Sequence, residues 1–495
     1  MSTDTTLPSG PPGDPAADDR LDRGVLLVAG VVVLGAIMSI LDVTVVSVAL
    51  KTFQEEFDAT TAQVAWTMTA YTLALASVIP LTGWASDRFG TKRLYLAAIV
   101  LFTAGSALCA AATSLEMLVA FRVVQGLGGG MLVPLGMTIL TRAAGPERIG
   151  RVMAVMGIPM LLGPICGPIV GGALIDSLSW HWIFLINVPI GIAAVIYSAK
   201  VLAPDNPTPS ESFDWLGMVL LSPGLALFLY GVSMIPETQT VQDAEVLVPA
   251  FIGALLIIAF VPWALARRNA HPLVDLRLFA NRNLTVAVIA MSLFAIAFFG
   301  ASLLFPQYFQ NVRGETALAS GLLLAPQGIG AMLTMPIAGA LSDRIGPGKI
   351  VLAGVTTIVV GMGLFATLDE STSYWFLGTA LFIQGLGMGA TMMPIMSAAL
   401  QTLRGPTVAR GSTLLNILQQ VAASIGTAIF SVLLTNGVKN DVDRAGANPL
   451  GDLAGVFSST FWVATVMIAV VLVPALLLPR RKAEAPVDPT LMMGH

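Results

Sequence analysis

The sequence predicts an all-α polytopic membrane protein with 14 transmembrane helices, arranged as two pseudo-symmetric six-helix bundles and a central helix pair. Three observations lead to this prediction: an apolar composition, a series of apolar segments of helical length, and a motif repeated in the two halves. The 495 residues are 56% hydrophobic and 11% charged, with a mean hydropathy of +0.83. Soluble domains carry about 25% charged residues, so an ordinary soluble fold is excluded.

The apolar segments have the length that one bilayer crossing needs, about 20 residues. Their predicted limits are 25–48, 62–85, 94–112, 115–141, 152–175, 181–203, 215–234, 247–266, 284–310, 318–341, 349–368, 374–401, 409–434 and 456–478. Lys and Arg concentrate on the cytoplasmic side of membrane proteins, and most of them fall on one side of these segments when both termini are placed inside. Residues 1–24 are then a disordered cytoplasmic tail, and residues 479–495 are a second cytoplasmic tail.

A repeated loop motif indicates an internal duplication. The pattern Gly-x-x-x-Asp-Arg-x-Gly follows the second and the tenth segments, and the sequence Gln-Gly-Leu-Gly occurs in the fourth and the twelfth. Duplicated transporter halves place the binding site between them, near the bilayer midplane. We therefore predict bundles at 25–203 and 284–478, with an inserted helix pair and its connectors at 204–283. The motif residues predict a latch at an inner gate: Gly83, Asp87, Arg88, Gly90, Gly339, Asp343, Arg344 and Gly346.

Asp42 and Arg122 are the only charged residues (Asp, Glu, Lys or Arg) that lie well inside the apolar segments, and their charges are opposite. An ionised group at the bilayer centre costs about 2.5–3.5 kcal/mol or more, so such residues pair with one another or carry ions. Both lie at a similar depth below the outer surface, as an ion pair requires. We predict that Asp42 exchanges protons and that Arg122 tunes its affinity. The alternative is a static ion pair that only fixes the packing of two helices.

Other residues within the segments are weaker candidates. Gly163, Gly167 and Gly171 repeat at four-residue spacing and leave one face of the fifth segment without side chains, and Pro164 and Pro168 perturb the same stretch. Such a face allows close helix contact, either for packing alone or as a pivot against the other half, for example against Gly321, Gly328 and Gly330. Buried polar side chains are candidates for a largely apolar substrate cavity with many Met and Phe residues nearby: Tyr71, Gln125, Gln307, Tyr308, Gln327, Gln384, Asn416 and Gln420.

Over nearly its whole length the chain resembles the major facilitator superfamily, in particular its fourteen-span drug:proton antiporter branch. The resemblance rests on the paired loops and on these blocks: Leu41–Leu50, Arg122–Gly126, Gly163–Gly172, Trp180–Pro189 and Phe213–Gly217. It implies a bacterial cell-membrane protein that exports lipophilic or amphipathic small molecules in exchange for protons, as in multidrug efflux. The Gly163–Gly172 block matches the motif that this family associates with antiport.

The sequence also argues against other function classes. It contains neither an ATP-binding Gly-x-x-x-x-Gly-Lys-Ser/Thr loop nor a hydrolase or zinc-protease motif, so we predict no enzyme activity and no cofactor besides the proton gradient. No basic block suggests nucleic acid. The expected partners are a small molecule, protons and the lipid bilayer, and the protein is expected to be monomeric. Alternatives are a dedicated exporter of one lipid or secondary metabolite, and a non-transporting membrane receptor or scaffold.

Overall fold

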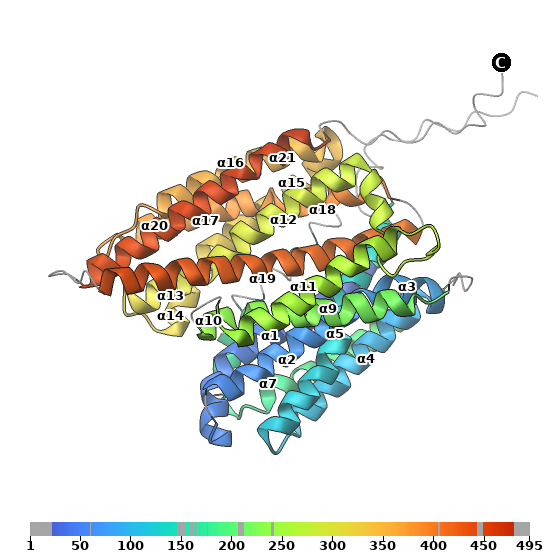
Figure 1. Ribbon diagram of the computed structural model, residues 1–495, viewed down its shortest axis with the longest axis horizontal. Coiled ribbons are helices and arrows are strands. Elements are labelled where there is room, and N and C mark those ends of the chain that lie inside the picture. Colours follow the sequence, from blue (N-terminus) through green and yellow to red (C-terminus); the bar gives the residue numbers. More distant parts are fainter. Residues whose placement is uncertain are drawn as a thin grey trace, which may run out of the picture.

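The computed structural model describes residues 22–59, 61–145, 148, 155, 157, 163, 166–167, 169–175, 177–205, 212–238, 242–403, 406–442 and 449–479. Within these residues every regular element is a helix, and the helices form two groups with a third element pair beside them (Figure 1). Large apolar side chains such as Phe251 and Trp375 are exposed, 69% and 88% respectively, on the outer surface of the helices. This surface suits a hydrocarbon environment.

The first group of helices packs around α5, which contacts α1, α2 and α4. Its elements are α1 (Arg23–Phe57), α2 (Thr61–Val78), α3 (Leu81–Phe89), α4 (Thr91–Ala110), α5 (Leu115–Ala144), α7 (Trp182–Leu185) and α8 (Asn187–Val201). Glycines allow this close packing, because a Cβ atom on Gly126 would lie 2.5 Å from the backbone oxygen of Tyr71.

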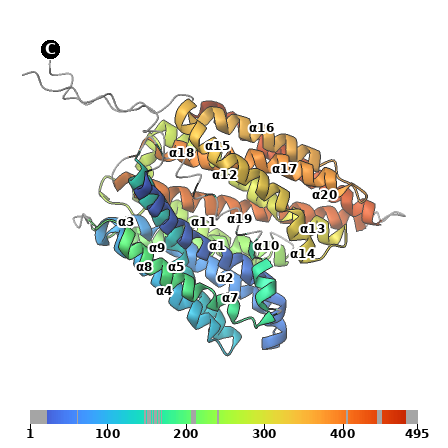
Figure 2. The same ribbon diagram turned by 180° about the vertical axis from the view of Figure 1, so that it is seen from behind.

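Figure 2 shows the second group from behind, with α16 along the edge that lies away from the first group. Its elements are α12 (Arg282–Ser302), α13 (Leu304–Asn311), α14 (Ala317–Leu323), α15 (Ala325–Ile345), α16 (Pro347–Phe365), α17 (Tyr374–Gly389), α18 (Met392–Leu400), α19 (Pro406–Val442), α20 (Pro449–Val470) and α21 (Leu472–Leu477). Helix α17 packs against α15 on one side and α16 on the other, while α12 packs against α19.

Between the two groups in sequence lie α9 (Trp215–Ser233), α10 (Ile235–Thr238), α11 (Ala244–Leu265) and the short 3-10 helix η3 (Leu276–Ala280). Helix α9 packs against α11, and also against α2 of the first group and α19 of the second. The buried Asp214 begins α9 by accepting a hydrogen bond from the backbone N–H of Gly217 (2.8 Å). The same carboxylate accepts hydrogen bonds from Trp263 Nε1 (2.8 Å) and Asn269 Nδ2 (3.0 Å), so it ties the start of α9 to the end of α11.

The described residues contain 12 helices that are long and apolar enough to cross a membrane, or 13 if one bent helix pair is counted as a span. Most of the predicted segment 152–175 lies outside the described residues, so the number fourteen stays a prediction. The predicted segment 62–85 is broken into α2 and α3, which meet at an angle of 55°. Pro80 precedes α3; proline lacks the amide hydrogen of a helix interior and clashes with the preceding turn.

The two motif loops have the same backbone geometry. Gly90 ends α3 with φ 95° and ψ 142°, and Gly346 ends α15 with φ 91° and ψ 141°. Residues with a side chain rarely adopt a positive φ of this size, so both positions favour glycine. Each glycine also begins the next helix, α4 or α16, which explains why the motif places a glycine directly after Asp-Arg-x.

Candidate functional site

Asp42 on α1 and Arg122 on α5 form a buried ion pair. Their exposed fractions are 2% and 0%, and Arg122 Nη1 donates a hydrogen bond to Asp42 Oδ2. Arg122 Nε donates to the backbone oxygen of Thr67 on α2 (2.9 Å), and the guanidinium carbon lies 4.2 Å from the ring centroid of Tyr71. The structure thus brings the two predicted charges together, with the arginine also held by a carbonyl and an aromatic face.

Three neutral polar side chains complete the site. Gln125 Nε2 donates to Asp42 Oδ1 (2.7 Å) and to Ser106 Oγ (2.6 Å), while Gln125 Oε1 accepts from Arg122 Nη1 (2.7 Å). Asn187 Nδ2 also donates to Asp42 Oδ1 (3.3 Å) and to Ser106 Oγ (3.3 Å). Helices α1, α4, α5 and α8 therefore each contribute one or more side chains to a single hydrogen-bonded network, which we call the Asp42 network.

The Asp42 network presents only hydrogen-bond donors to the carboxylate. Each of the three nitrogens that face Asp42 carries hydrogen atoms and can only donate; none can accept a proton from the carboxyl group. The carboxylate has about four lone-pair sites, and three of them receive side-chain donors from α5 and α8.

Sequence reasoning did not identify Ser106 and Asn187 as part of this site. Asn187 appeared in the sequence analysis only within the Trp180–Pro189 block. Neutral polar residues are common in apolar segments, so one of them alone does not indicate a functional site. Gln125 is one of the candidates for the substrate cavity, and the structure places it in the Asp42 network. Its position one helical turn after Arg122 was the available signal, since residues three apart share a helix face.

The other cavity candidates lie at several places. Tyr71 hydrogen-bonds to Ser39 (3.1 Å) beside the Asp42 network. Asn416 on α19 donates to Met137 Sδ on α5 (3.4 Å), at the seam between the two groups. Tyr308 is buried and donates to the backbone oxygen of Asp369 (2.7 Å), at the far end of the second group. Gln384 is buried inside the second group, and the remaining three are half-buried: Gln307, Gln327 and Gln420.

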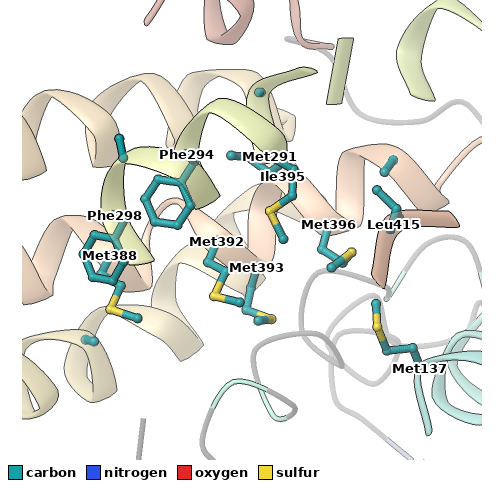
Figure 3. Close-up of a cluster of buried hydrophobic side chains, with 14 of the residues drawn as sticks. Met137, Met291, Phe294, Phe298, Met388, Met392, Met393, Ile395, Met396 and Leu415 are labelled. Carbon is teal, nitrogen blue, oxygen red and sulfur yellow. The ribbon is translucent and has the colours of Figure 1, made fainter. Parts of the chain in front are cut away.

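Buried methionines from both groups gather in one cluster, as Figure 3 shows. Those labelled there come from α12, α17, α18 and α5, with two phenylalanines of α12 beside them: Met291, Met388, Met392, Met393, Met396, Met137, Phe294 and Phe298. Methionine is flexible and polarisable, so methionine-rich surfaces adapt to ligands of different shapes. We refer to these eight residues as the methionine wall.

At one end of the molecule the two groups are joined. Asp87 on α3 lies 3.6 Å from Arg142 on α5 and 3.9 Å from Arg410 on α19. Arg410 also lies 3.8 Å from Asp275, which begins η3. Two hydroxyl contacts reinforce the junction, Thr82 with Thr413 (2.9 Å) and Thr138 with Ser412 (3.1 Å).

The remaining motif residues lie near this end. Gly83 lies against α19, where a Cβ atom would be 3.4 Å from Thr413 Oγ1, an ordinary contact distance. Arg88 and Arg344 are exposed, and Asp343 is buried as Asp87 is. Gly339 is buried in α15, one turn before Asp343.

The glycine face of the fifth segment packs against a different partner from the one expected. Cβ atoms on Gly163, Gly167 and Gly171 would lie 2.2, 2.0 and 3.1 Å from side chains of α1, namely Ile40, Thr44 and Val45. Thr44 Oγ1 donates to the backbone oxygen of Gly163 (3.1 Å). The contact is therefore made within the first group and not with Gly321, Gly328 or Gly330. Pro164 and Pro168 lie outside the described residues.

Comparisons with known proteins agree with this geometry. The family model described as the Major Facilitator Superfamily matches residues 32–427. The chain is 47% identical over 518 aligned residues to the multidrug resistance protein B homolog of Mycobacterium tuberculosis, covering 97% of this chain and 96% of that protein. It is 32% identical over 405 residues to the multidrug export protein EmrB of Escherichia coli K12, covering 81% and 79% of the two chains.

Solved structures share the fold at low sequence identity. The human organic anion transporter MFSD10 has a TM-score of 0.61 at 17% identity, covering 90% of this chain and 99% of that one. The proton:xylose symporter XylE has a TM-score of 0.58 at 14% identity, covering 89% and 94%. The family match, the two relatives and the helical architecture lead to one conclusion: the chain belongs to the Major Facilitator Superfamily of membrane transporters.

Proposed function

We propose that the protein is a proton-coupled antiporter of the fourteen-span branch that exports lipophilic or amphipathic small molecules, as a multidrug efflux transporter. The names of its relatives in Mycobacterium tuberculosis and Escherichia coli support the proposal that its cargo is a range of drug-like molecules. The observation that carries the coupling is the Asp42 network, where a carboxylate deep in an apolar protein is ringed by donors. Both termini would lie in the cytoplasm, as the distribution of Lys and Arg predicts.

Asp42 would be the proton carrier because its affinity for a proton depends on its neighbours. A nearby guanidinium favours the charged carboxylate, and burial without donors favours the protonated form. Arg122 stays charged throughout. Separation of α1 from α5 or α8 would take hydrogen-bond donors away from the Asp42 carboxylate, which would then bind a proton. The return of these helices would restore the donors, and Asp42 would release the proton. Gln125 and Asn187 are positioning residues in this scheme, since they hold the carboxylate against Arg122.

The proton gradient supplies enough free energy for such a pump. One proton that crosses 100 mV inward releases about 2.3 kcal/mol, and one pH unit adds about 1.4 kcal/mol. Together they would sustain a concentration ratio of several hundredfold for a neutral substrate exchanged one for one with a proton, since about 1.4 kcal/mol corresponds to a factor of ten.

The methionine wall supports a broad range of cargo, because its side chains can repack around ligands of different shapes. The second candidate is a dedicated exporter of one lipid or secondary metabolite. Competition among chemically unrelated dyes separates the two. If several dyes inhibit one another's transport, broad export is supported. If the other dyes leave the transport rate of one compound unchanged, a single cargo is supported.

Inside-out membrane vesicles test the proposal directly. With a pH gradient imposed so that the vesicle lumen is acidic, the protein is expected to accumulate several unrelated fluorescent compounds in the lumen. A protonophore should release them. Vesicles without the protein provide the background. If the protein moved no compound of a broad panel at any proton gradient, a non-transporting receptor or scaffold would replace the antiporter.

Arg410→Gln is expected to open the junction at Asp87, which we propose is the inner gate. The substitution removes two partly buried ion pairs, to Asp87 and Asp275, together worth about 1 kcal/mol. The equilibrium should therefore shift about fivefold toward an inner-open form. A cysteine introduced as Met137→Cys, at the seam, should react about five times faster with an impermeant maleimide in inside-out vesicles.

This test needs a background without native thiols and a matched control. Cys109→Ala and Cys166→Ala remove the two cysteines of the chain. Arg268→Gln removes an exposed arginine at the end of α11, and it should leave the reaction rate unchanged. Equal rates in the Arg410→Gln and parent proteins would show that the ion pairs do not latch this end.

A further inference from the structure

An apolar groove lies on the outer face of the helices, apart from the Asp42 network and the methionine wall. It is a hollow of about 780 Å³ where the beginnings of α2 and α11 meet the end of α9, and its lining includes Gln63, Trp66, Tyr230 and Glu245. A second hollow, of about 350 Å³, lies between α2 and α5; it shares Gln63 and Trp66 and adds Glu116. We call the two together the Trp66 groove.

The Trp66 groove continues along the helices into a surface that is apolar except for Ser77. A third hollow of about 360 Å³ starts at Trp66 and follows α2 and α5 past Leu73 and Val123 to Leu127. Since α2 and α5 are predicted to cross the bilayer, this path runs from its polar edge toward its middle. The shape suits a ligand with one end in the headgroup region and an apolar chain between the helices.

Trp66 is presented for contact with such a ligand. Its side chain is 40% exposed, and its ring stacks on that of Tyr230 at 5.6 Å with an interplanar angle of 30°. This pair joins α2 to α9 and leaves the remaining indole surface toward the groove. A Trp face is the most favourable aromatic partner for an organic cation.

The charges of the groove have one sign. Glu116 and Glu245 are exposed carboxylates at its polar edge, one on each side of Trp66. The described residues that line the three hollows include no Lys, Arg or His. An ammonium head would therefore meet two carboxylates and an aromatic face, whereas a phosphate or carboxylate head would be repelled.

We propose that the Trp66 groove binds a single-chain amphiphile with an ammonium head, with the head between Glu116 and Glu245 and the chain along α2 and α5. The hollow along α2 and α5 that would hold the chain is about 360 Å³, within the range of about 300–1,000 Å³ of sites that hold one small ligand. This site is peripheral, and it does not depend on the proton coupling proposed above.

Photolabelling of the whole protein in phosphatidylcholine nanodiscs, with no proton gradient, tests the proposal. The probe is a hexadecyltrimethylammonium analogue with a diazirine in its chain, and labelled peptides are identified by mass spectrometry. Label is expected on α2, α5, α9 and α11. Unlabelled hexadecyltrimethylammonium should suppress it at least fivefold, and hexadecanol or hexadecyl sulfate at equal concentration should not.

Two variants separate the head contact from the chain contact. Glu116→Gln with Glu245→Gln should lower labelling at least fivefold, and Trp66→Leu about threefold. The matched control is Glu56→Gln with Asp452→Asn, which removes two exposed carboxylates of other helix ends and should leave labelling unchanged. Equal suppression by hexadecanol, or unchanged labelling of the Glu116/Glu245 variant, would overturn the proposal and make the groove an ordinary contact with lipid tails. Because binding is measured without transport, either result is independent of whether the protein is an antiporter.

Discussion

Asp42→Asn is expected to abolish uphill export, so that the steady-state concentration ratio of a neutral substrate falls from as much as several hundredfold to one. Asparagine has nearly the shape of aspartate, but it cannot take up or release a proton in the working range of pH. The measurement is accumulation in inside-out vesicles under an imposed pH gradient. Exchange of labelled for unlabelled substrate, which needs no proton movement, should persist.

The control for this variant concerns the arginine. Removing one partner of a buried ion pair leaves an unpaired charge and costs about 3–5 kcal/mol of stability, so loss of transport alone would be ambiguous. Asp42→Asn combined with Arg122→Gln removes both charges and should recover thermal stability while accumulation stays absent. Pumping at the parent rate by Asp42→Asn would leave the ion pair as a static element that fixes α1 against α5.

Gly361→Ala is expected to cost several kcal/mol and to remove most of the folded protein. Gly361 lies where α16 crosses α17, and a Cβ atom there would lie 2.5 Å from the backbone nitrogen of Gln384 and 2.8 Å from the oxygen of Ala380. Backbone atoms of a helix cannot rotate away as a side chain can, so the two helices would have to separate. The loss exceeds the gain of about 1 kcal/mol that alanine brings to a helix. Yield of monodisperse protein and the unfolding temperature in detergent measure the effect.

Gly363→Ala provides a matched control on the same helix. Its Cβ atom would lie 3.7 Å from Thr465 Cγ2, an ordinary contact distance. The variant should be as stable as the parent, or more stable by up to about 1 kcal/mol. Similar losses in both variants would mean that helix α16 tolerates no alanine here for reasons other than its contact with α17.

The class of fold could be predicted from the sequence, because the bilayer imposes the length and polarity of each membrane-spanning segment. It was less informative where helices break. The segment 62–85 looked continuous by composition, and the 55° bend between α2 and α3 depends on one proline, Pro80. Helix α1 continues to Phe57, beyond the predicted end at residue 48, since a helix can extend past the apolar core without an apolar sequence.

The candidate site was predictable in its charges and not in its neutral parts. A carboxylate and a guanidinium are rare in apolar segments, because a charged side chain in the bilayer core costs free energy. This cost alone predicts that Asp42 pairs with Arg122. Asn187 and Ser106 carry no such cost, and nothing in the sequence indicates that α4 and α8 deliver them to the same carboxylate. Arg142 and Arg410 were counted only as basic residues of the inner surface, because their pairing with Asp87 depends on how α3, α5 and α19 meet.

The position of α9 between α2 and α19 has a mechanical consequence. The surface it shares with α19 is apolar, with Val232 of α9 close to Ala428 and Val432 of α19, and such a surface can slide without breaking directional bonds. In the proposed transport cycle the two groups would move relative to each other, and α9 would shield this part of their junction from lipid tails. Bilayer thickness and fluidity should then affect the turnover rate through their contact with α9.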